Sequence, residues 1–445
     1  MRYLPLTPAD RSAMLEVVGA PDIDSLFADI PHEHRLDGPI EGLPLHASEL
    51  SVERHMKALA AKNVAAGDVP FFIGAGAYRH HIPASVDHLI QRGEFLTAYT
   101  PYQPEIAQGT LQMLFEFQTQ VARLYGCAVA NASMYDGSTA CWEAVGMARR
   151  ITRRGRVLLS DGLHPHYVAT IRTMAKFTGD AIVGEMPKLE AACDEDALIA
   201  ALDDETSCVV MQYPDILGRL PDLAKIAEAT HAAGALLVAV VTEPVALGAI
   251  KSPGELGADI VVGEGQSIGV GLQFGGPYLG LFAVRDPKHV RQMPGRLCGE
   301  TVDAEGKRGF VLTLSTREQH IRRERATSNI CTNHGLIALS MTIRTAMLGR
   351  TGFEHVAKTC LSRAEYLKQA LVATGKVSLA YTGPTFNEFV IRRKSGSAQA
   401  LVDAGITQGI LAGIPVGERD LLVAVTEKRT KADLDRLVAL VSSAE

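Results

Sequence analysis

The fold class is decided by residues 236–284, which contain the apolar runs LLVAVV (236–241), DIVV (259–262) and YLGLFAV (278–284). Each run has the length of one buried strand and is bounded by residues that favour turns or loops. Helical patterns fill most of the gaps between such runs, so the chain is expected to form an α/β fold with a seven-stranded, mostly parallel sheet. The four earlier runs lie at residues 127–132, 157–160, 181–183 and 208–212.

The interval between the last two runs differs from the others, since residues 263–276 hold six glycines. Such a segment is too poor in helix-forming residues for a crossover helix, so the run at 278–284 is expected to be antiparallel or at an edge. Within the interval, GQSIG (265–269) fits the G-x-S-x-G pattern of hydrolases, with Ser267 as nucleophile. That pattern requires a helix after the serine, and the glycines argue against one. A hydrolase is kept only as an alternative.

The chain is expected to have three parts. Residues 1–66 would form a helical arm, residues 67–328 the large domain with the seven strands, and residues 329–445 a smaller C-terminal α+β domain. The first helix of the arm is bounded by Thr7 as its N-cap and Gly19 as its left-handed stop. Further helices are expected at residues 51–64, 104–125, 336–348 and 354–374, and further strands at 389–392 and 421–425.

Composition and charge exclude several classes of function. Of the 445 residues, 47% are hydrophobic and 21% are charged, which is typical of a folded globular chain. The 44 basic and 50 acidic residues leave a net charge of −6, so there is no overall basic footprint for nucleic acid. No apolar stretch reaches the roughly 20 residues that cross a bilayer, and the N-terminal residues lack a signal-peptide pattern. No membrane association and a cytoplasmic location are therefore expected.

Cysteine and histidine spacings do not predict a metal site. The seven cysteines are scattered without a CxxC pair, which favours reduced thiols over disulfides or zinc. The doublets His32/His34, His80/His81 and His164/His166 lack a further ligand at a recognisable spacing, so no metal is expected. The charged run 317–325 is expected to be a solvated helix face, with an anion or partner contact as the alternative.

Two polar stretches are candidates for binding. In SMYDGST (133–139), the residues Gly137, Ser138 and Thr139 lie between an expected strand and an expected helix, where free backbone N–H groups bind anions. An ordinary helix cap is the competing interpretation. In YTPYQPE (99–105), prolines fix a loop that presents two phenols, an amide and a carboxylate. A packed surface loop is the alternative there.

Six long strings stand out along the chain: RYLPLTPADRSAML (2–15), YTPYQPEIAQGTLQ (99–112), SMYDGSTA (133–140), GADIVVGEGQSIG (257–269), GGPYLG (275–280) and TREQHIRRERATSNICTN (316–333). These strings resemble one known family, the glycine cleavage system P-proteins, or glycine dehydrogenase (decarboxylating). The resemblance is to subunit 1 of the split prokaryotic form and covers nearly the whole chain.

The resemblance implies the aminotransferase-like fold of pyridoxal 5′-phosphate (PLP) enzymes, fold type I. In that chemistry the cofactor is the electron sink, while the protein supplies a Schiff-base lysine, an acid at the pyridine nitrogen and a phosphate cradle. The complete enzyme is implied to decarboxylate glycine and to transfer the aminomethyl group to the lipoyl-lysine of H-protein.

The resemblance also implies that this chain lacks the Schiff-base lysine. Gln266 and Ser267 stand where relatives have His-Lys, and Lys251 is the only lysine between Lys225 and Lys288. Glu243 stands where an aspartate is expected to face the pyridine nitrogen. An amide or a hydroxyl cannot form the Schiff base, so the isolated chain is expected to be inactive. PLP would be held by the partner, glycine dehydrogenase subunit 2.

In this fold the active site lies at a dimer interface, so a degenerate chain can still contribute residues across it. The candidates for this supporting role are Tyr99, Thr100, Tyr102, Gln103 and Glu105. A vestigial cradle on the chain's own side would comprise Gly137, Ser138 and Thr139, with Glu243. The alternative is a non-catalytic scaffold or regulatory subunit of the same complex.

Overall fold

The computed structural model describes residues 6–187, 189 and 193–443. The chain divides into two compact units, Met1–Val64 and Ala65–Glu445. The division expected between residues 67–328 and 329–445 stays a prediction. No helix among the described residues is both long and apolar enough to cross a membrane.

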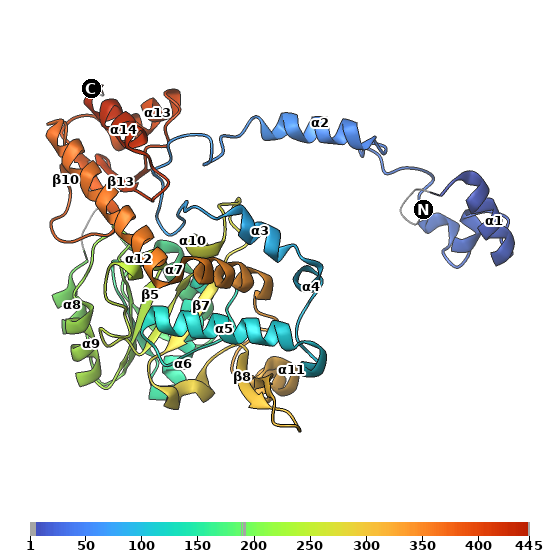
Figure 1. Ribbon diagram of the computed structural model, residues 1–445, viewed down its shortest axis with the longest axis horizontal. Helices are drawn as coiled ribbons and strands as arrows, with labels where there is room; N and C mark the ends of the chain where they lie inside the picture. The colour runs from blue at the N-terminus through green and yellow to red at the C-terminus, as the bar shows by residue number, and fades with distance from the viewer. Residues whose placement is uncertain (1–5, 188, 190–192, 444–445) are drawn as a thin grey trace. The chain divides into compact units, whose positions relative to one another are not determined.

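The first unit contains helices α1 (Pro8–Val18) and α2 (Glu49–Ala60), shown in Figure 1. Thr7 caps α1 through a reciprocal capping box with Asp10, and Gly19 ends it in the left-handed conformation, both as the sequence predicts. Helix α2 begins and ends earlier than the expected span of 51–64. Neither helix has a buried residue, and α2 exposes the apolar side chains Leu50, Val52, Met56 and Leu59.

The large sheet of the second unit contains the seven expected strands. They are β1 (Val129–Ala130), β2 (Arg156–Leu159), β3 (Ala181–Val183), β4 (Thr206–Gln212), β5 (Leu236–Val241), β6 (Ile260–Glu264) and β7 (Gly280–Val284). Their order is β1-β7-β6-β5-β4-β2-β3. The five strands β2 to β6 pair in parallel, and β7 is antiparallel to both β1 and β6. The expected antiparallel direction of β7 is confirmed, and its position is internal.

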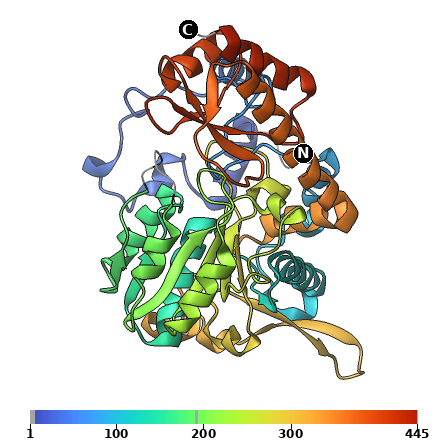
Figure 2. The same ribbon diagram turned by 90° about the vertical axis from the view of Figure 1, so that its left-hand side faces the viewer.

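Both faces of this sheet are covered, as Figure 2 shows, which explains why its central strands are continuously apolar. In β5, Leu237 and Ala239 pack with α5 and α9, whereas Val238 and Val240 pack with α6 and α7. These helices are α5 (Gln108–Tyr125), α6 (Gly137–Thr152), α7 (Pro165–Ala175) and α9 (Leu223–Ala232). The helix expected at 104–125 thus begins at Gln108, because Pro104–Ile106 forms a separate 3₁₀ turn, η3.

A four-stranded antiparallel sheet, in the order β10-β11-β13-β12, belongs to the C-terminal part. Its strands are β10 (Val377–Leu379), β11 (Glu388–Arg393), β12 (Ile414–Pro415) and β13 (Asp420–Ala424). Helices α12 (Gly335–Ala373), α13 (Ala398–Thr407) and α14 (Lys431–Ser443) accompany it. The two helices expected at 336–348 and 354–374 are the halves of α12, which kinks at Gly349 with φ 57° and ψ −175°.

The sequence did not predict the hairpin of β8 (Leu297–Val302) and β9 (Arg308–Thr313). After it, the run 317–325 is not the solvated helix that its charges suggested, because it breaks into short turns and buries Glu318. Those turns are η6 (Ser315–Arg317), α11 (Gln319–Arg322) and η7 (Arg323–Arg325). The other short elements are η1 (Asp24–Phe27), η2 (His32–His34), α3 (Ala84–Ile90), α4 (Gly93–Leu96), α8 (Glu195–Ala200), η4 (Pro244–Gly248), α10 (Gln266–Gly269) and η5 (Pro287–Gln292).

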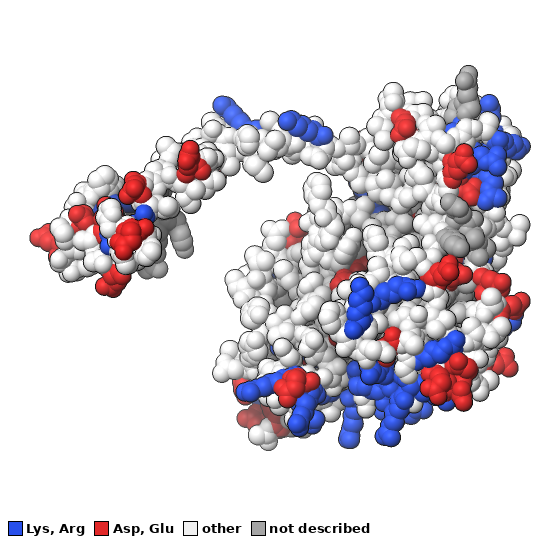
Figure 3. Space-filling view, turned by 180° about the vertical axis from the view of Figure 1, so that it is seen from behind, with Lys and Arg blue, Asp and Glu red and all other residues white. Residues whose placement is uncertain are grey.

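Acidic and basic side chains are interspersed over the face drawn in Figure 3, with a group of Lys and Arg along its lower edge.

Candidate functional site at the carboxyl edge of the large sheet

Two neighbouring parallel strands carry the polar residues singled out in the sequence. Glu243 follows β5, while Gln266 and Ser267 open α10, directly after β6. Ligand sites of open α/β sheets lie at the carboxyl ends of the strands, which is where these three side chains come together. All three are buried, with about 2% of each residue exposed. The one-turn helix α10 ends at Gly269, so the glycine-rich sequence does stop the helix that a hydrolase elbow would need.

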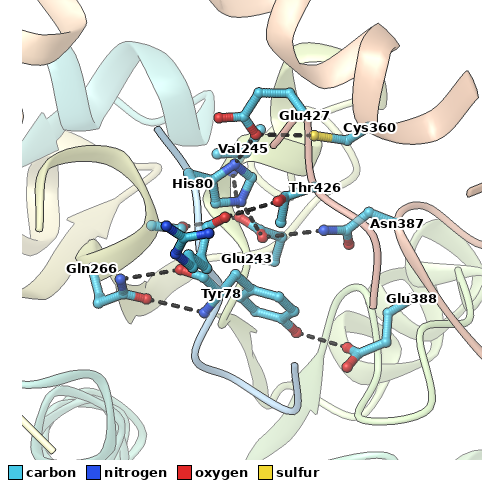
Figure 4. Close-up of polar contacts among 12 residues, drawn as sticks. Tyr78, His80, Glu243, Val245, Gln266, Cys360, Asn387, Glu388, Thr426 and Glu427 are labelled. Atoms are coloured by element: carbon cyan, nitrogen blue, oxygen red, sulfur yellow. Dashed lines mark hydrogen bonds and ion pairs between the residues drawn. The ribbon is translucent and has the colours of Figure 1, made fainter. Parts of the chain in front are cut away.

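Glu243 is surrounded by hydrogen-bond donors, which Figure 4 shows in close-up. Its Oε1 accepts from Ser267 Oγ at 2.9 Å and from the Val245 backbone at 3.1 Å. Its Oε2 lies 2.9 Å from His80 Nε2 and 3.3 Å from Asn387 Nδ2. Ser267 thus donates to a carboxylate and is not bonded to the histidine, so the base of a hydrolase is missing.

Gln266 ties the sheet edge to the backbone of Tyr78. Its Oε1 accepts from the Tyr78 N–H at 3.1 Å, while its Nε2 donates to the Tyr78 carbonyl at 3.2 Å and to the Val270 carbonyl at 2.7 Å. A side-chain amide can donate and accept at once, whereas an ammonium group can only donate. The amide therefore suits this paired contact with a neighbouring backbone.

His80 lies between two carboxylates in the same region, the buried Glu243 and the partly buried Glu427. Its Nδ1 is 2.7 Å from Glu427 Oε2, and its Nε2 is 2.9 Å from Glu243 Oε2. Burial alone lowers the pKa of His80, but the charge of Glu243 and the surrounding hydrogen bonds prevail and raise it well above its usual value. Burial also opposes ionisation of Glu427, yet its contacts with His80 lower the pKa of Glu427 to about 2.

His80, Cys360 and Glu427 are residue types that bind metals, and their ligand atoms lie within 4.8 Å of one another. Two ligands of a tetrahedral zinc ion stand about 3.3 Å apart or more, given bonds of about 2.0 Å. The 2.7 Å separation of His80 Nδ1 and Glu427 Oε2 is instead a hydrogen-bond distance. The geometry fits an ion-paired histidine better than a metal ligand.

Tyr78 and Glu388 extend the cluster toward β11. Tyr78 donates its hydroxyl to Glu388 Oε2 at 2.7 Å, and the Ala75 N–H donates to Glu388 Oε1 at the same distance. Burial is the main cause that raises the pKa of Glu388 to about 7, against the two hydrogen bonds that lower it. The segment 75–80 is thereby anchored on both sides, by Gln266 and by Glu388.

The N-terminus of α6 contains the candidate anion cradle, and carboxylates of this chain occupy it. Asp136 caps the helix, accepting from the backbone N–H groups of Ser138 at 2.8 Å and Thr139 at 3.0 Å. Both hydroxyl groups also donate to Asp136. The Gly137 N–H donates to Glu264 Oε2 at 3.0 Å. No free donor of these three residues remains for a phosphate, and Asp136 would repel one.

The residues present therefore do not fit a PLP cofactor bound to this chain. Gln266 and Ser267, at the place where the resemblance implies a lysine, have side chains that are committed to other contacts. The acid Glu243 is already paired with His80, and the donors of the cradle are satisfied. The nearest lysine in sequence, Lys251, is exposed and precedes β6.

The loop 99–105 is not joined to this cluster by any hydrogen bond among the described residues. Tyr99 and Tyr102 are 77% and 65% exposed, and Gln103 and Glu105 are also exposed. Thr100 accepts a hydrogen bond from the buried Arg296, whose guanidinium lies 5.7 Å from the ring centroid of Tyr102. The polar groups of the loop thus face outward, while Thr100 is held by its contact with Arg296.

Sequence reasoning missed several residues of the cluster. Tyr78, Asn387, Glu388 and Glu427 carry no local motif, and His80 was considered only as half of a histidine doublet. His80 is 163 residues from Glu243 and 347 residues from Glu427 along the chain, so only the tertiary fold brings them together.

The strand order, with β7 antiparallel among parallel strands, is that of fold type I, the fold of many PLP-dependent enzymes. Solved structures with the same fold include a sphingosine-1-phosphate lyase from Burkholderia pseudomallei, 15% identical with a TM-score of 0.64 and 92% of each chain covered. A glutamate decarboxylase from Lactobacillus brevis is 14% identical, with a TM-score of 0.65, and covers 93% of this chain and 98% of its own. The predicted α/β fold class is confirmed.

The chain belongs to the glycine cleavage system P-protein family, whose family model matches residues 1–441. Probable glycine dehydrogenase (decarboxylating) subunit 1 from Erythrobacter litoralis is 65% identical over 98% of each chain. The protein of the same name from Novosphingobium aromaticivorans is 64% identical over 99% of this chain and 98% of its own. A crystal structure of glycine decarboxylase (P-protein) in inhibitor-bound form is 43% identical, with a TM-score of 0.87 and 99% of each chain covered.

Proposed function

We propose that this chain is the subunit of a two-chain glycine decarboxylase that does not bind the cofactor covalently. With subunit 2 it would decarboxylate glycine and transfer the aminomethyl group to the lipoyl-lysine of H-protein. The observation that carries the proposal is the buried pair Gln266 and Ser267 at the carboxyl end of β6, neither of which can form a Schiff base. PLP would be held by the lysine of subunit 2, where it supplies the electron sink for loss of CO2.

The chain's own contribution would come from the exposed loop 99–105. Two phenols, an amide and a carboxylate point outward there, from Tyr99, Tyr102, Gln103 and Glu105. Placed against the active site of subunit 2, such groups would orient the glycine carboxylate or bind the cofactor phosphate. Thr100 would be held in place by its contact with the buried Arg296.

The location of the cofactor is tested by spectroscopy on the separate and combined chains. We expect the purified chain to be colourless with PLP, and the absorbance of a Schiff base to arise when subunit 2 is added. Borohydride reduction followed by peptide mapping should label a lysine of subunit 2. A reduced PLP adduct on a buried position of this chain would contradict the proposal.

A scaffold or regulatory subunit is the second candidate, since no hydrogen bond among the described residues joins the loop to the buried cluster. Tyr99→Phe and Tyr102→Phe in the reconstituted complex separate the two, with CO2 release from glycine in the presence of lipoylated H-protein as the readout. A supporting role predicts a loss of turnover of about tenfold or more with the complex intact. The matched control is Tyr366→Phe, which removes the hydroxyl of another partly exposed tyrosine, on α12. Unchanged turnover in both loop variants would favour the scaffold.

A further inference from the structure

A buried histidine is bonded to two carboxylates from distant parts of the chain. Glu243 follows β5 of the large sheet, and Glu427 follows β13 of the small sheet. His80 comes from the segment that Gln266 and Glu388 anchor on either side. Figure 4 shows its ring between the two carboxylates, with Cys360 and Asn387 beside them.

We propose that His80 is a built-in ligand of this site: its ring binds the acid that the pyridinium ring of PLP would need, and it joins the two sheets. The inference deepens the proposed function, on which it rests only in assigning the cofactor to subunit 2. It adds a second obstacle to PLP binding on this chain, besides the lack of an amine at Gln266 and Ser267.

The hydrogen-bond geometry determines the protonation of the ring. Both ring nitrogens lie within 2.9 Å of a carboxylate oxygen, and ionised carboxylates only accept hydrogen bonds. A neutral imidazole has one N–H group and could satisfy only one of the two acceptors. The doubly protonated ring satisfies both, and the raised pKa of His80 agrees with this assignment.

The ring takes the hydrogen-bond partner that a PLP site would offer to the pyridine nitrogen. In PLP enzymes an acid pairs with the protonated pyridine nitrogen, and here the corresponding acid, Glu243, pairs with a protonated imidazole nitrogen. Asp136 and Glu264 likewise take the donors that would bind a phosphate. The amide of Gln266 fills the lysine position and holds the segment that carries His80.

The remaining charged and titratable groups around His80 keep the cluster balanced. Two groups of α12 contact or face Glu427. The thiol of Cys360 donates toward the Glu427 carboxylate at 3.7 Å, and the positive charge of Arg344 interacts with the negative charge of Glu427. Glu388 of β11 acts on Glu243 through its charge and is bonded to Tyr78. Removing His80 would leave Glu243 and Glu427 without their shared cation, which is costly in a buried site.

The test compares His80→Ala with His81→Ala in the full-length chain combined with subunit 2. His81 is the exposed neighbour, and it contacts Glu427 only through its backbone N–H, which alanine retains. We expect His80→Ala to lower the Tm of this chain by about 5 °C or more, and His81→Ala to leave it nearly unchanged. Added imidazole should raise the Tm of His80→Ala and have no such effect on His81→Ala.

Glu243→Gln keeps the inference testable if His80→Ala does not fold. It preserves volume and removes one of the two charges, so a lower Tm than that of Glu94→Gln, at an exposed position, is expected. Equal Tm values for His80→Ala and His81→Ala would overturn the inference, as would an absent imidazole effect on a folded His80→Ala. The inference would also be overturned if the purified chain retained one zinc ion and His80→Ala lost that ion, because the cluster would then be a metal site. None of these readouts uses turnover, whereas the proposed function fails only if PLP is found on this chain.

Discussion

At the scale of single residues, the most informative position is Ser267. The resemblance to the family implies a lysine there in cofactor-bearing relatives, yet the groups around Ser267 are committed to other contacts. Glu243 is paired with His80, and the N-terminus of α6 is capped by Asp136. A new amine beside Glu243 would form an ion pair with that carboxylate and find no group that holds the cofactor's phosphate or ring.

We therefore expect Ser267→Lys to leave the chain unable to bind PLP specifically. The measurement is the absorbance of the chain with PLP, followed by borohydride reduction and peptide mapping at residue 267. Ser267→Ala serves as the control for the lost hydrogen bond to Glu243. A yellow protein with a reduced adduct at residue 267 would show that the surrounding residues still form a cofactor site.

Among the elements, helix α6 is tightly packed at its N-terminus. A Cβ atom on Gly137 would lie 2.1 Å from the Tyr167 hydroxyl and 3.0 Å from the backbone of Gly263 on β6. Gly137→Ala is expected to cost about 1–3 kcal/mol of unfolding free energy through this crowding. The change is measured from the midpoint of denaturant unfolding, and an unchanged slope of the transition shows that the midpoint reports stability.

Gly146 in the same helix provides the matched control. A Cβ atom there meets only the end of the flexible Arg150 side chain, at 3.4 Å. Gly146→Ala should therefore stabilise the helix by about 0.5–1 kcal/mol, because alanine is the better helix former. Equal midpoints for the two variants would mean that the packing at the start of α6 is looser than described.

The elements also show what sequence could and could not predict. The strands β4, β5 and β6 were recognisable because burial on both faces makes them continuously apolar. The hairpin of β8 and β9 was missed, since Glu300 and Arg308 interrupt its pattern. Glu243, Gln266 and Ser267 were singled out as cofactor positions only through the resemblance to the family. The partners of Glu243 could not be predicted, because His80 and Asn387 approach it only in the tertiary structure.

For the whole molecule, the buried titratable groups predict a stability that falls as the pH rises from about 5 to about 9. The pKa of Glu388 is raised to about 7 and that of Glu264 to about 8, with burial as the first cause in both. A raised pKa in the folded state gives stability that is complete below the unfolded value, about 4.5, and lost as pH passes the folded value. The raised pKa of His80 adds a loss with the same sign, which begins near its unfolded value of about 6.5.

The Tm should therefore decrease between about pH 5 and pH 9, and Glu388→Gln should make this decrease smaller. The glutamine keeps an oxygen for the Ala75 N–H and removes the group that titrates near pH 7. Glu427 has the opposite sign, because its lowered pKa gives stability that is lost as pH falls from about 4.5 toward 2. Thermal unfolding followed by circular dichroism from about pH 2 to pH 9 measures both the loss at acid pH and the loss at higher pH. A Tm that rises from pH 5 to pH 9 would contradict the assignment.

The carboxylate cap at the start of α6 has a consequence for protein engineering. Asp136 and Glu264 accept from the donors at the start of that helix, His80 is paired with Glu243, and Gln266 is bonded to the backbone of Tyr78. A designer who wanted a cofactor site on this chain would therefore have to change several of these contacts together, and one new lysine would not be enough.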